Sequence, residues 1–364
     1  MEIFISFIMF FILSEALLLF LRFLFRKHEK KTWQSVLIVS VKILLAVAFA
    51  VLPLAGPVQL RPAQPFMMAA YAALLPDAAA DIVYGVYLLA SKKERSFKAG
   101  AVLGLVFGAA FFVFGVVNMQ TVKPEYRTFN SDKLSHEYNV VFMADMHIGS
   151  PQLFSTVEKT VGHIKDLNAD AVILGGDIVD DYTTKDEMEK TFALFKDFGA
   201  PVYYVFGNHD RQGHAEYAGG VKFTEEDLLD AMEKNGVTAL RDEFVVLGRD
   251  LLILGREDLS ETEKRKSYDD ITNPSPDAFL LVADHQPNDF DNASAFGADL
   301  QLSGHTHAGQ LFPMRFLYSL IGGAVWGEYE KNGKTLFVSS GFAGWRVPFR
   351  TDASCRYEVI TLKP

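Results

Sequence analysis

Ser303-Gly304-His305-Thr306-His307 is the stretch that says most about the fold, because it ends an apolar run with two histidines one residue apart. Two imidazoles so spaced at a strand end can reach two neighbouring metal ions. Four earlier segments also place carboxylate, amide or imidazole groups where an apolar run stops: Asp145-Met146-His147, Gly176-Asp177-Ile178-Val179-Asp180, Gly207-Asn208-His209-Asp210 and Asp284-His285-Gln286-Pro287. Ligands of α/β sheets gather beyond the carboxyl ends of strands, so we expect these segments to meet at one site.

Around these motifs, short apolar strands alternate with polar helical segments, which is typical of α/β layers. Strands are predicted at residues 140–144, 171–174, 202–206, 244–247, 251–254, 279–283, 300–302, 336–338 and 357–361. Helices are predicted at residues 153–167, 185–198 and 224–235. The third helix has Thr224 as its expected N-cap, followed by three acidic residues that suit the helix dipole.

The five motifs, D-x-H, G-D-x-x-D, G-N-H-D, H-x-P and G-H-T-H, resemble in content and order those of the calcineurin-like metallophosphoesterase superfamily, over roughly residues 139–362. The resemblance implies an α/β metallophosphoesterase domain of two mixed β-sheets packed face to face and flanked by helices. It also implies two divalent metal ions as cofactors. Seven side chains correspond to their ligands: Asp145, His147 and His307 at the first ion, Asn208, His285 and His305 at the second, and Asp177 as the bridge.

Two further residues resemble the catalytic groups of that family. His209 corresponds to the general acid or phosphate-orienting histidine, and Asp210 is expected to fix the tautomer of His209. Paired metal ions clamp a phosphoryl oxygen and lower the pKa of a bridging water, so the implied reaction is attack of a metal-bridging hydroxide on phosphorus. Oxygen and imidazole ligands without thiolates suit Mn, Fe or Zn.

The first third of the chain differs in composition from the rest. Residues 1–118 hold 11 Lys and Arg against 6 Asp and Glu, which leaves 24 against 39 for residues 119–364. An acidic second part argues against nucleic acid as a partner, because phosphate backbones are bound by basic residues. The single cysteine, Cys355, excludes an intrachain disulfide and a thiolate metal cluster.

Four apolar segments lie in the first part, at residues 3–25, 36–55, 66–90 and 99–117. Each is long enough to cross a bilayer core of about 30 Å at about 1.5 Å per residue. The first lacks the basic start and small-residue cleavage site of a signal peptide, which predicts a retained helix. We therefore expect a four-helix transmembrane domain over residues 1–118, a linker with the first edge strand over 119–138, and the phosphoesterase domain over 139–364.

The loops between the apolar segments predict the orientation of the protein. Only Arg61 lies in the second loop, whereas the first and third hold Arg26, Lys27, Lys30, Lys31, Lys92, Lys93, Arg95 and Lys98. Cytoplasmic loops collect lysine and arginine. The sequence thus predicts a multi-pass protein of the cell membrane with both termini and the catalytic domain on the extracytoplasmic side.

Four ionisable residues, Glu15, Lys42, Asp77 and Asp81, lie inside the apolar segments. Their depths coincide at about 16 to 22 Å from the outer ends of the helices. Charges at such depth usually face a partner or a wet cavity. Two interpretations stay open: charge pairing that keeps the helices in register, and a functional polar cavity that admits a group such as a lipid head group.

Other residues are candidates for substrate contacts. The apolar residues 311–326 directly follow the metal histidines, and either pack in the core or form a lip that touches the membrane or an acyl chain. Arg256, Arg346 and Arg350 are candidate phosphate ligands, with structural ion pairing as the alternative. His214 is a further candidate for contact with the substrate.

The sequence therefore predicts a membrane-anchored, dinuclear metal-dependent hydrolase of phosphodiester or pyrophosphate bonds. Its expected partners are the lipid bilayer and a lipid-linked or small phosphodiester substrate. Residues 304–313, GHTHAGQLFP, are similar to a bacterial subgroup of membrane-bound phosphoesterases. The alternatives are a phosphomonoesterase or phosphoprotein phosphatase, a metal-binding membrane sensor, and a transport module.

Overall fold

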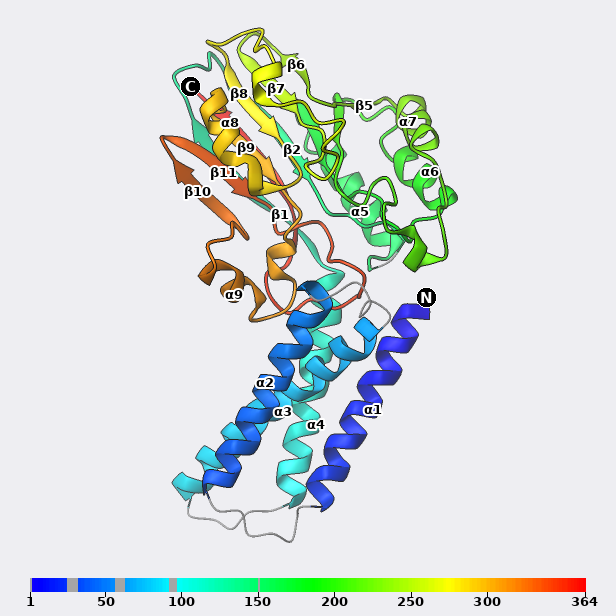
Figure 1. Cartoon of the computed structure of the whole chain (residues 1–364), viewed down its shortest axis with the longest axis vertical. Coiled ribbons are helices and arrows are strands. Elements are labelled where there is room, and N and C mark those ends of the chain that lie inside the picture. Colours follow the sequence, from blue (N-terminus) through cyan, green and yellow to red (C-terminus); the bar gives the residue numbers. More distant parts are fainter. Residues whose placement is uncertain (1, 25–31, 56–62, 92–96, 150) are drawn as a thin grey trace. The chain divides into compact units, whose positions relative to one another are not determined.

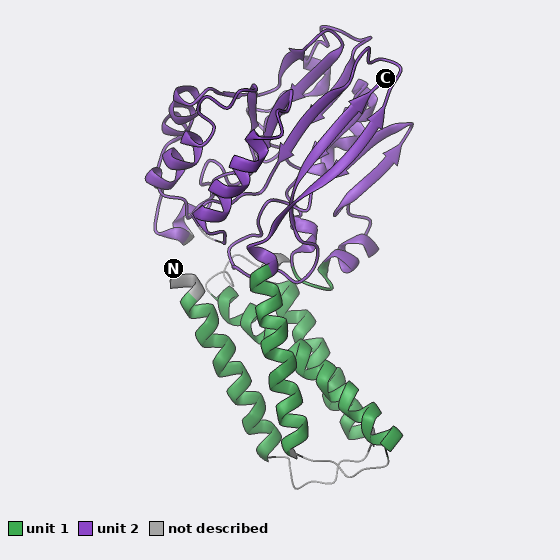
Figure 2. Ribbon diagram, turned by 180° about the vertical axis from the view of Figure 1, so that it is seen from behind, with its two compact units in different colours: residues 1–117, 311–314 green, residues 118–310, 315–364 purple. Residues whose placement is uncertain are grey.

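The computed structural model describes residues 2–24, 32–55, 63–91, 97–149 and 151–364. The chain divides into two compact units. The first comprises residues 1–117 and 311–314, and the second comprises residues 118–310 and 315–364 (Figure 2). Residues 311–314 therefore group with the N-terminal helices, although we expected them inside the phosphoesterase domain.

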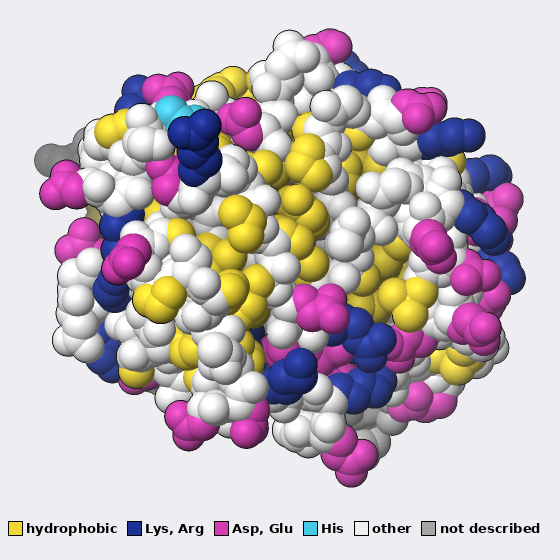
Figure 3. All heavy atoms as spheres, turned by 90° about the horizontal axis from the view of Figure 1, so that it is seen from above, with side chains coloured by type: hydrophobic (Ala, Val, Ile, Leu, Met, Phe, Trp, Pro, Cys, Tyr) yellow, Lys and Arg dark blue, Asp and Glu magenta, His cyan; other side chains and the backbone are white. Residues whose placement is uncertain are grey.

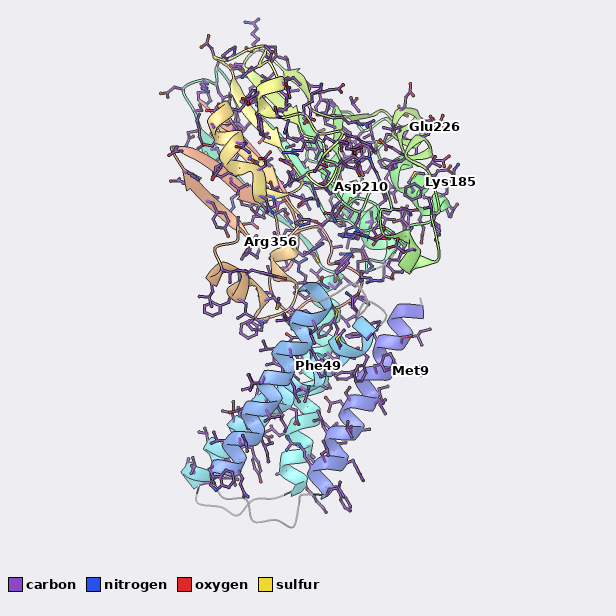
Figure 4. The ribbon with its side chains drawn as sticks, viewed as in Figure 1. Met9, Phe49, Lys185, Asp210, Glu226 and Arg356 are labelled. Carbon is purple, nitrogen blue, oxygen red and sulfur yellow. The ribbon has the colours of Figure 1, made fainter. Side chains whose placement is uncertain are left out.

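Four helices form most of the first unit: α1 (Glu2–Leu24), α2 (Thr32–Ala55), α3 (Gln64–Ser91) and α4 (Phe97–Met119) (Figure 1). Each is long and apolar enough to cross a membrane, which confirms the predicted four-helix bundle. Apolar side chains face outward, as Met9 does in Figure 4. Most basic residues used to predict the orientation lie outside the described residues: Arg26, Lys27, Lys30, Lys31, Arg61, Lys92, Lys93 and Arg95.

Charged residues inside the bundle meet, and Arg22 joins those predicted from the sequence. Lys42 Nζ lies 2.5 Å from Asp77 Oδ2 and 2.5 Å from Asp81 Oδ2. Arg22 Nη2 lies 2.5 Å from Asp77 Oδ1, and its Nη1 lies 3.0 Å from Asp81 Oδ1. Two cations thus neutralise two carboxylates. Glu15 is buried outside these ion pairs, and its Oε1 accepts no hydrogen bond from the described residues.

Glycines of α4 allow this helix to approach the buried carboxylates closely. A Cβ atom at Gly104 would lie 2.6 Å from Asp77 Oδ1, and one at Gly108 would overlap Glu15 Oε1. Small residues are the usual means by which membrane helices bring their backbones together. A larger side chain at either position would therefore push α4 away from the charged centre of the bundle.

Two six-stranded sheets form the second unit, in the orders β1-β12-β2-β3-β4-β5 and β10-β11-β9-β8-β7-β6. The first sheet contains β1 (Val122–Asn130), β2 (Tyr138–Met143), β3 (Ala171–Gly175), β4 (Val202–Val205), β5 (Val237–Ala239) and β12 (Cys355–Lys363). The second contains β6 (Glu243–Leu247), β7 (Leu251–Gly255), β8 (Phe279–Ala283), β9 (Leu300–Ser303), β10 (Gly327–Lys331) and β11 (Lys334–Val338).

Both sheets are mixed, and an apolar cluster joins them. β12 pairs with β1 in parallel and with β2 in antiparallel register, while β6 and β10 are antiparallel edge strands of the second sheet. Phe142 of β2 and Leu281 of β8 belong to the same buried cluster, which draws side chains from both sheets. The fold implied by the family resemblance is therefore confirmed: two mixed sheets share one core.

Helices cover the outer faces of the two sheets. They are α5 (Phe154–Lys165), α6 (Lys185–Ala193), α7 (Glu225–Lys234) and α8 (Phe290–Phe296). A further helix, α9 (Met314–Leu320), contributes to neither of the two apolar clusters that those helices join. α5, α6 and α7 contribute to the apolar cluster on the first sheet, and α8 to that on the second. Thr224 caps α7 as predicted, in a capping box with Asp227. On the face seen in Figure 3, side chains of both charges surround a band of apolar ones.

Candidate metal centre

The side chains predicted as metal ligands stand in loops that directly follow five strands. Asp145 and His147 follow β2, Asp177 follows β3, Asn208 follows β4, His285 follows β8, and His305 and His307 follow β9. In two groups of three residues, the potential ligand atoms all lie within 4.8 Å of one another: Asp145, His147 and His307, and Asp177, His285 and His305. The carboxyl ends of strands from both sheets therefore converge on one site.

A single oxygen of Asp177 lies between the two groups. Asp177 Oδ2 is 3.1 Å from His285 Nε2 and 3.7 Å from His147 Nε2. In the first group, His147 Nε2 and His307 Nε2 are 3.3 Å apart, and His307 Nε2 is 3.7 Å from Asp145 Oδ1. This spacing fits two adjacent cations that share one carboxylate.

Hydrogen bonds fix the histidine rings in the tautomer that a metal ion requires. His285 Nδ1 lies 2.9 Å from the carbonyl oxygen of Gly175, and His307 Nδ1 lies 3.2 Å from that of Ala343. A carbonyl oxygen only accepts, so each Nδ1 carries the proton of the hydrogen bond. The Nε2 atom of each ring is then left to bind a metal ion. His285 Nε2 is buried and takes part in no hydrogen bond within the described chain, and the same holds for Asn208 Oδ1. Such unpartnered buried polar atoms fit the coordination of a cation.

Burial keeps two of the imidazoles neutral, which is the protonation state that binds metal. It lowers the pKa of His307 well below its usual range. It also lowers the pKa of His305 to about 4, with help from the neighbouring His285. Asp177 differs, because the charges of His285 and His209 outweigh its burial and hold its pKa well below the usual range. Asp177 therefore supplies a negative charge beside the neutral nitrogens of His305 and His307, which favours the binding of a cation.

The loops that carry these residues have an unusual backbone conformation. The left-handed region, rare outside glycine, is adopted by Asp145 (φ 59°), His147 (φ 45°), Asp177 (φ 51°), His305 (φ 75°) and His307 (φ 50°). Strained residues of this kind cluster at functional sites. Glycines provide the space: a Cβ at Gly304 would lie 2.5 Å from Asp145 Oδ2, and one at Gly207 would overlap Asp177.

His209 lies beside the first group, and its partner is Asp181 rather than the predicted Asp210. His209 Nδ1 is 2.8 Å from Asp181 Oδ2, while its ring centroid is 5.6 Å from that of His147. Burial disfavours the protonated ring, but the charge of Asp177 and the hydrogen bond with Asp181 outweigh it and raise the pKa of His209 to about 8. His214 stands close by, with its ring 5.9 Å from that of His209.

Asp210 instead holds the backbone of two ligand loops, which corrects the prediction that it orients His209. Its carboxylate accepts hydrogen bonds from the amides of Gly207 (2.6 Å), Asp177 (3.0 Å), Ile178 (3.0 Å) and Val179 (3.2 Å). Both carboxylate oxygens are occupied, so none is left for the imidazole. Figure 4 shows Asp210 in the interior of the second unit.

Comparison with known proteins shows which family this part of the chain resembles. Residues 138–309 match the model of the calcineurin-like phosphoesterases. This part of the chain is similar to a calcineurin-like phosphoesterase domain. Its relatives include a metallophosphoesterase of Helicobacter pylori strain J99, 32% identical over 247 residues (64% of this chain, 62% of that protein). Another, from Campylobacter jejuni, is 27% identical over 301 residues (78% of this chain, 76% of that protein).

The relatives also bear on the helices that precede the phosphoesterase domain. A transmembrane protein with metallophosphoesterase domain from Danio rerio is 27% identical over 286 residues, or 72% of this chain and 62% of that protein. With the four apolar helices, it indicates a membrane protein. The chain spans 62% of the length of the Helicobacter relative.

Two of the three candidate arginines have structural roles in the phosphoesterase domain. Arg256 is buried, with Nη1 2.6 Å from Asp242 Oδ1 and its guanidinium over the ring of Tyr268. Arg350 is also buried and donates hydrogen bonds to the carbonyl oxygens of His307 (2.9 Å) and Ala343 (2.7 Å). Neither presents its guanidinium to a substrate, but Arg350 holds the loop that carries His307.

Arg346 is the candidate arginine that lies near His209. Its guanidinium stands 5.3 Å from the ring of Trp345 and 5.1 Å from the ring of Tyr182, and it donates a hydrogen bond to the Tyr182 hydroxyl. The ring of Trp345 in turn lies 5.7 Å from that of His209. Two pairs of neighbours in the sequence contribute to this cluster, because Tyr182 directly follows Asp181 and Arg346 directly follows Trp345. The sequence does not show that the two pairs meet.

Proposed function

We propose that this protein is a membrane-anchored phosphoesterase that uses two divalent metal ions to hydrolyse a phosphodiester or pyrophosphate bond. The observation that carries the proposal is the position of Asp177 Oδ2, within reach of both His285 Nε2 and His147 Nε2. One carboxylate shared by two ligand groups is the arrangement that two adjacent ions need. The oxygen and imidazole donors suit Mn, Fe or Zn.

The chain itself supplies a proton donor beside this centre. Bound divalent ions would polarise the phosphoryl oxygens and lower the pKa of water. His209 is held on Asp181 through Nδ1, which directs its Nε2 away from that carboxylate. The hydrogen bond with Asp181 and the charge of that carboxylate favour the protonated ring, which can give its proton to the leaving oxygen. Asp181 remains anionic and stabilises the charged ring.

The attached helices favour a substrate that resides in the membrane. A lipid phosphodiester or a lipid-linked pyrophosphate would lie within reach of a domain joined to four apolar helices. The excess of basic residues in the first and third loops supports an extracytoplasmic catalytic domain. Reporter fusions at Lys27, Arg61 and Lys98 test this orientation, and periplasmic reporter activity at Lys27 and Lys98 would contradict it.

Hydrolysis of two model substrates tests the proposal. The detergent-purified full chain with Mn²⁺ is expected to cleave bis-p-nitrophenyl phosphate more efficiently than p-nitrophenyl phosphate. Asp177→Asn and His209→Gln should each lower the diesterase rate about 100-fold or more. His163→Gln, at an exposed position of α5, is the matched control and should keep full activity.

The pattern of activities separates the alternatives. Cleavage of the monoester alone would point to a phosphomonoesterase or phosphoprotein phosphatase. If metal analysis found two ions per chain and neither ester was cleaved, a metal-binding sensor would explain the protein better. Diesterase activity that survives Asp177→Asn would show that the shared carboxylate is not required, and would overturn the assignment of the site.

A further inference from the structure

The second unit exposes an apolar helix face close to the residues that join it to the first. α9 buries Met314 but leaves Phe316 62% and Leu320 66% exposed, and Ile321, just after it, is 80% exposed. Phe316 and Leu320 are four residues apart and share one side of the helix. Soluble proteins seldom gather large apolar side chains on an open helix face, unless that face binds something.

The start of α9 belongs to the helical unit. Residues 311–314 group with the membrane helices, and the Tyr71 hydroxyl of α3 donates a hydrogen bond of 2.8 Å to the carbonyl oxygen of Phe312. Because a helix rises about 1.5 Å per residue, Leu320 lies within about 9 Å of Met314 along the axis. The exposed face is therefore tethered to the bundle through a segment that packs within it.

A second exposed apolar pair is tied to the end of a membrane helix. Leu153 is 61% exposed and Phe154 is 37% exposed at the start of α5. Gln120, the residue after the end of α4, accepts a hydrogen bond from the Leu153 amide (3.1 Å) and donates one to the carbonyl oxygen of Pro151 (2.8 Å). Like α9, this pair is joined to a chain segment that leaves the bundle.

We propose that α9, with Phe316, Leu320 and Ile321, and the pair Leu153 and Phe154 insert into the interfacial region of the lipid bilayer. Both segments continue from the places where the chain leaves the helical unit, after α4 and after residues 311–314. We therefore assign the lipid bilayer as the binding partner, because aromatic and leucine side chains partition into the membrane interface. Arg315 has an exposed guanidinium that pairs with Asp352 at 3.1 Å and stands over Trp326. Such a pair of a basic and an aromatic side chain suits the membrane interface.

The insertion also bears on the substrate, in a step that rests on the proposed function. Leu311 follows His307 by four residues, so the loop that carries His305 and His307 continues directly into the membrane-docked segment. A docked α9 would hold this loop beside the head groups. The phosphoesterase would then take amphiphilic substrates from the bilayer without drawing their acyl chains into water.

Site-specific fluorescent labelling of the full chain in liposomes tests the insertion. Phe316→Cys, Leu320→Cys and Ile321→Cys each receive an environment-sensitive dye, while Cys355 is fully buried and stays unlabelled. Val246→Cys, 60% exposed on β6, is the matched aqueous control, and Leu44→Cys, 68% exposed on α2, is the lipid-facing control. We expect the α9 labels to be quenched by nitroxide lipids and shielded from iodide, as at Leu44.

Two outcomes would overturn the insertion. Labels on α9 that iodide quenches as strongly as at Val246 would show that the helix faces water. Labels shielded from both quenchers would show that another protein surface, such as a second copy of this chain, covers the helix.

A kinetic comparison tests the consequence for the substrate. The triple variant Phe316→Ser, Leu320→Ser and Ile321→Ser should cleave soluble bis-p-nitrophenyl phosphate at the wild-type rate and a phosphodiester lipid in liposomes about tenfold more slowly. Equal loss on both substrates, or on neither, would contradict the role in substrate access. If the wild type cleaves neither, the proposed function fails while the labelling result stands by itself.

Discussion

His209 Nδ1 lies 2.8 Å from Asp181 Oδ2 in a loop that also contributes Asp180 to the surroundings of His147. Asp181 thus fixes the ring and stabilises its charged form, while the neighbouring Asp210 is fully engaged with backbone amides. Asp181, the neighbour of His209 in space, therefore orients the ring, whereas Asp210, its neighbour in sequence, holds the backbone of the loops.

Substitution of Asp181 and of Asp210 should separate orientation from loop structure. We expect Asp181→Asn to lower kcat about 10- to 100-fold with little change in metal content, because only the imidazole loses its partner. Asp210→Asn should lower the metal content and the thermal stability as well, since four amides lose a charged acceptor. Equal metal loss in both variants would contradict this division. Kinetics with elemental analysis of the purified proteins would measure it.

Metal content should depend unequally on the residues of the two groups. Asp177→Asn is expected to reduce binding at both positions, because its Oδ2 reaches His285 and His147. His307→Gln should affect only the first position and leave about one ion per chain. Mass-spectrometric metal counts after dialysis provide the measurement. The shared-carboxylate assignment would not survive if Asp177→Asn retained two ions.

Removal of the buried Arg350 guanidinium should weaken the loop that carries His307. Arg350→Met removes a charged donor from each of the carbonyl oxygens of His307 and Ala343, a loss of about 3 kcal/mol, or roughly 10 °C in the unfolding midpoint. Arg350→Lys should recover little, because one ammonium cannot replace the planar fork. Arg127→Met, on a partly exposed arginine, serves as the control. Thermal unfolding in detergent measures the difference, and similar midpoints for the variants at 350 and 127 would disprove it.

Glu358 should make stability depend on pH. Its side chain is fully buried in β12, Oε1 accepts a hydrogen bond from the Ser339 hydroxyl (2.8 Å), and burial raises its pKa to about 8. Between about pH 4.5 and 8 the folded state holds a proton that the unfolded state loses, so stability falls as pH rises, by up to about 3 kcal/mol at pH 7.

Glu358→Gln should therefore flatten the pH dependence of unfolding above pH 5 and stabilise the phosphoesterase domain at pH 8. Thermal midpoints from pH 5 to pH 8 would test this, with Glu328→Gln on the exposed edge strand β10 as the comparison. A wild-type midpoint that rises over this range relative to Glu358→Gln would have the opposite sign to our expectation.

The charged centre of the helical bundle should tolerate paired but not single neutralisation. Lys42→Met leaves Asp77 and Asp81 with Arg22 alone, so we expect a lower yield of monodisperse protein after extraction. The double variant Lys42→Met and Asp77→Asn restores the balance of charge and should recover much of that yield. Size-exclusion profiles would measure it. No loss in the single variant would favour the polar-cavity interpretation over charge pairing.

The sequence predicted the five strands that carry the ligand motifs, and their order along the chain, because each motif ends an apolar run. It also indicated that Glu15, Lys42, Asp77 and Asp81 lie at similar depths in the membrane, and three of these four residues meet in ion pairs. Arg22 was not included because it stands near the end of its helix. The strands β5 and β10 and the short helices α8 and α9 were not predicted, because few residues form each of them and their patterns are brief.

The partner of His209 could not be read from the sequence for a different reason. Asp181 is 28 positions away from the histidine along the chain, whereas Asp210 is adjacent to it, and adjacency is the only proximity that a sequence displays. The parallel pairing of β1 with β12 is likewise a tertiary relationship. The residue pattern of neither strand indicates which strand it pairs with.

The position of β12 between β1 and β2 has a consequence for the order in which the protein assembles during translation. β1 emerges from the ribosome directly after the last membrane helix, but the strand that pairs with it over residues 355–363 is made after all other elements of the domain. Until then β1 and β2 present open edges to each other across a missing strand. β1 therefore stays unpaired until the end of the domain has been synthesised, and its open edge is exposed to wrong pairing in the meantime.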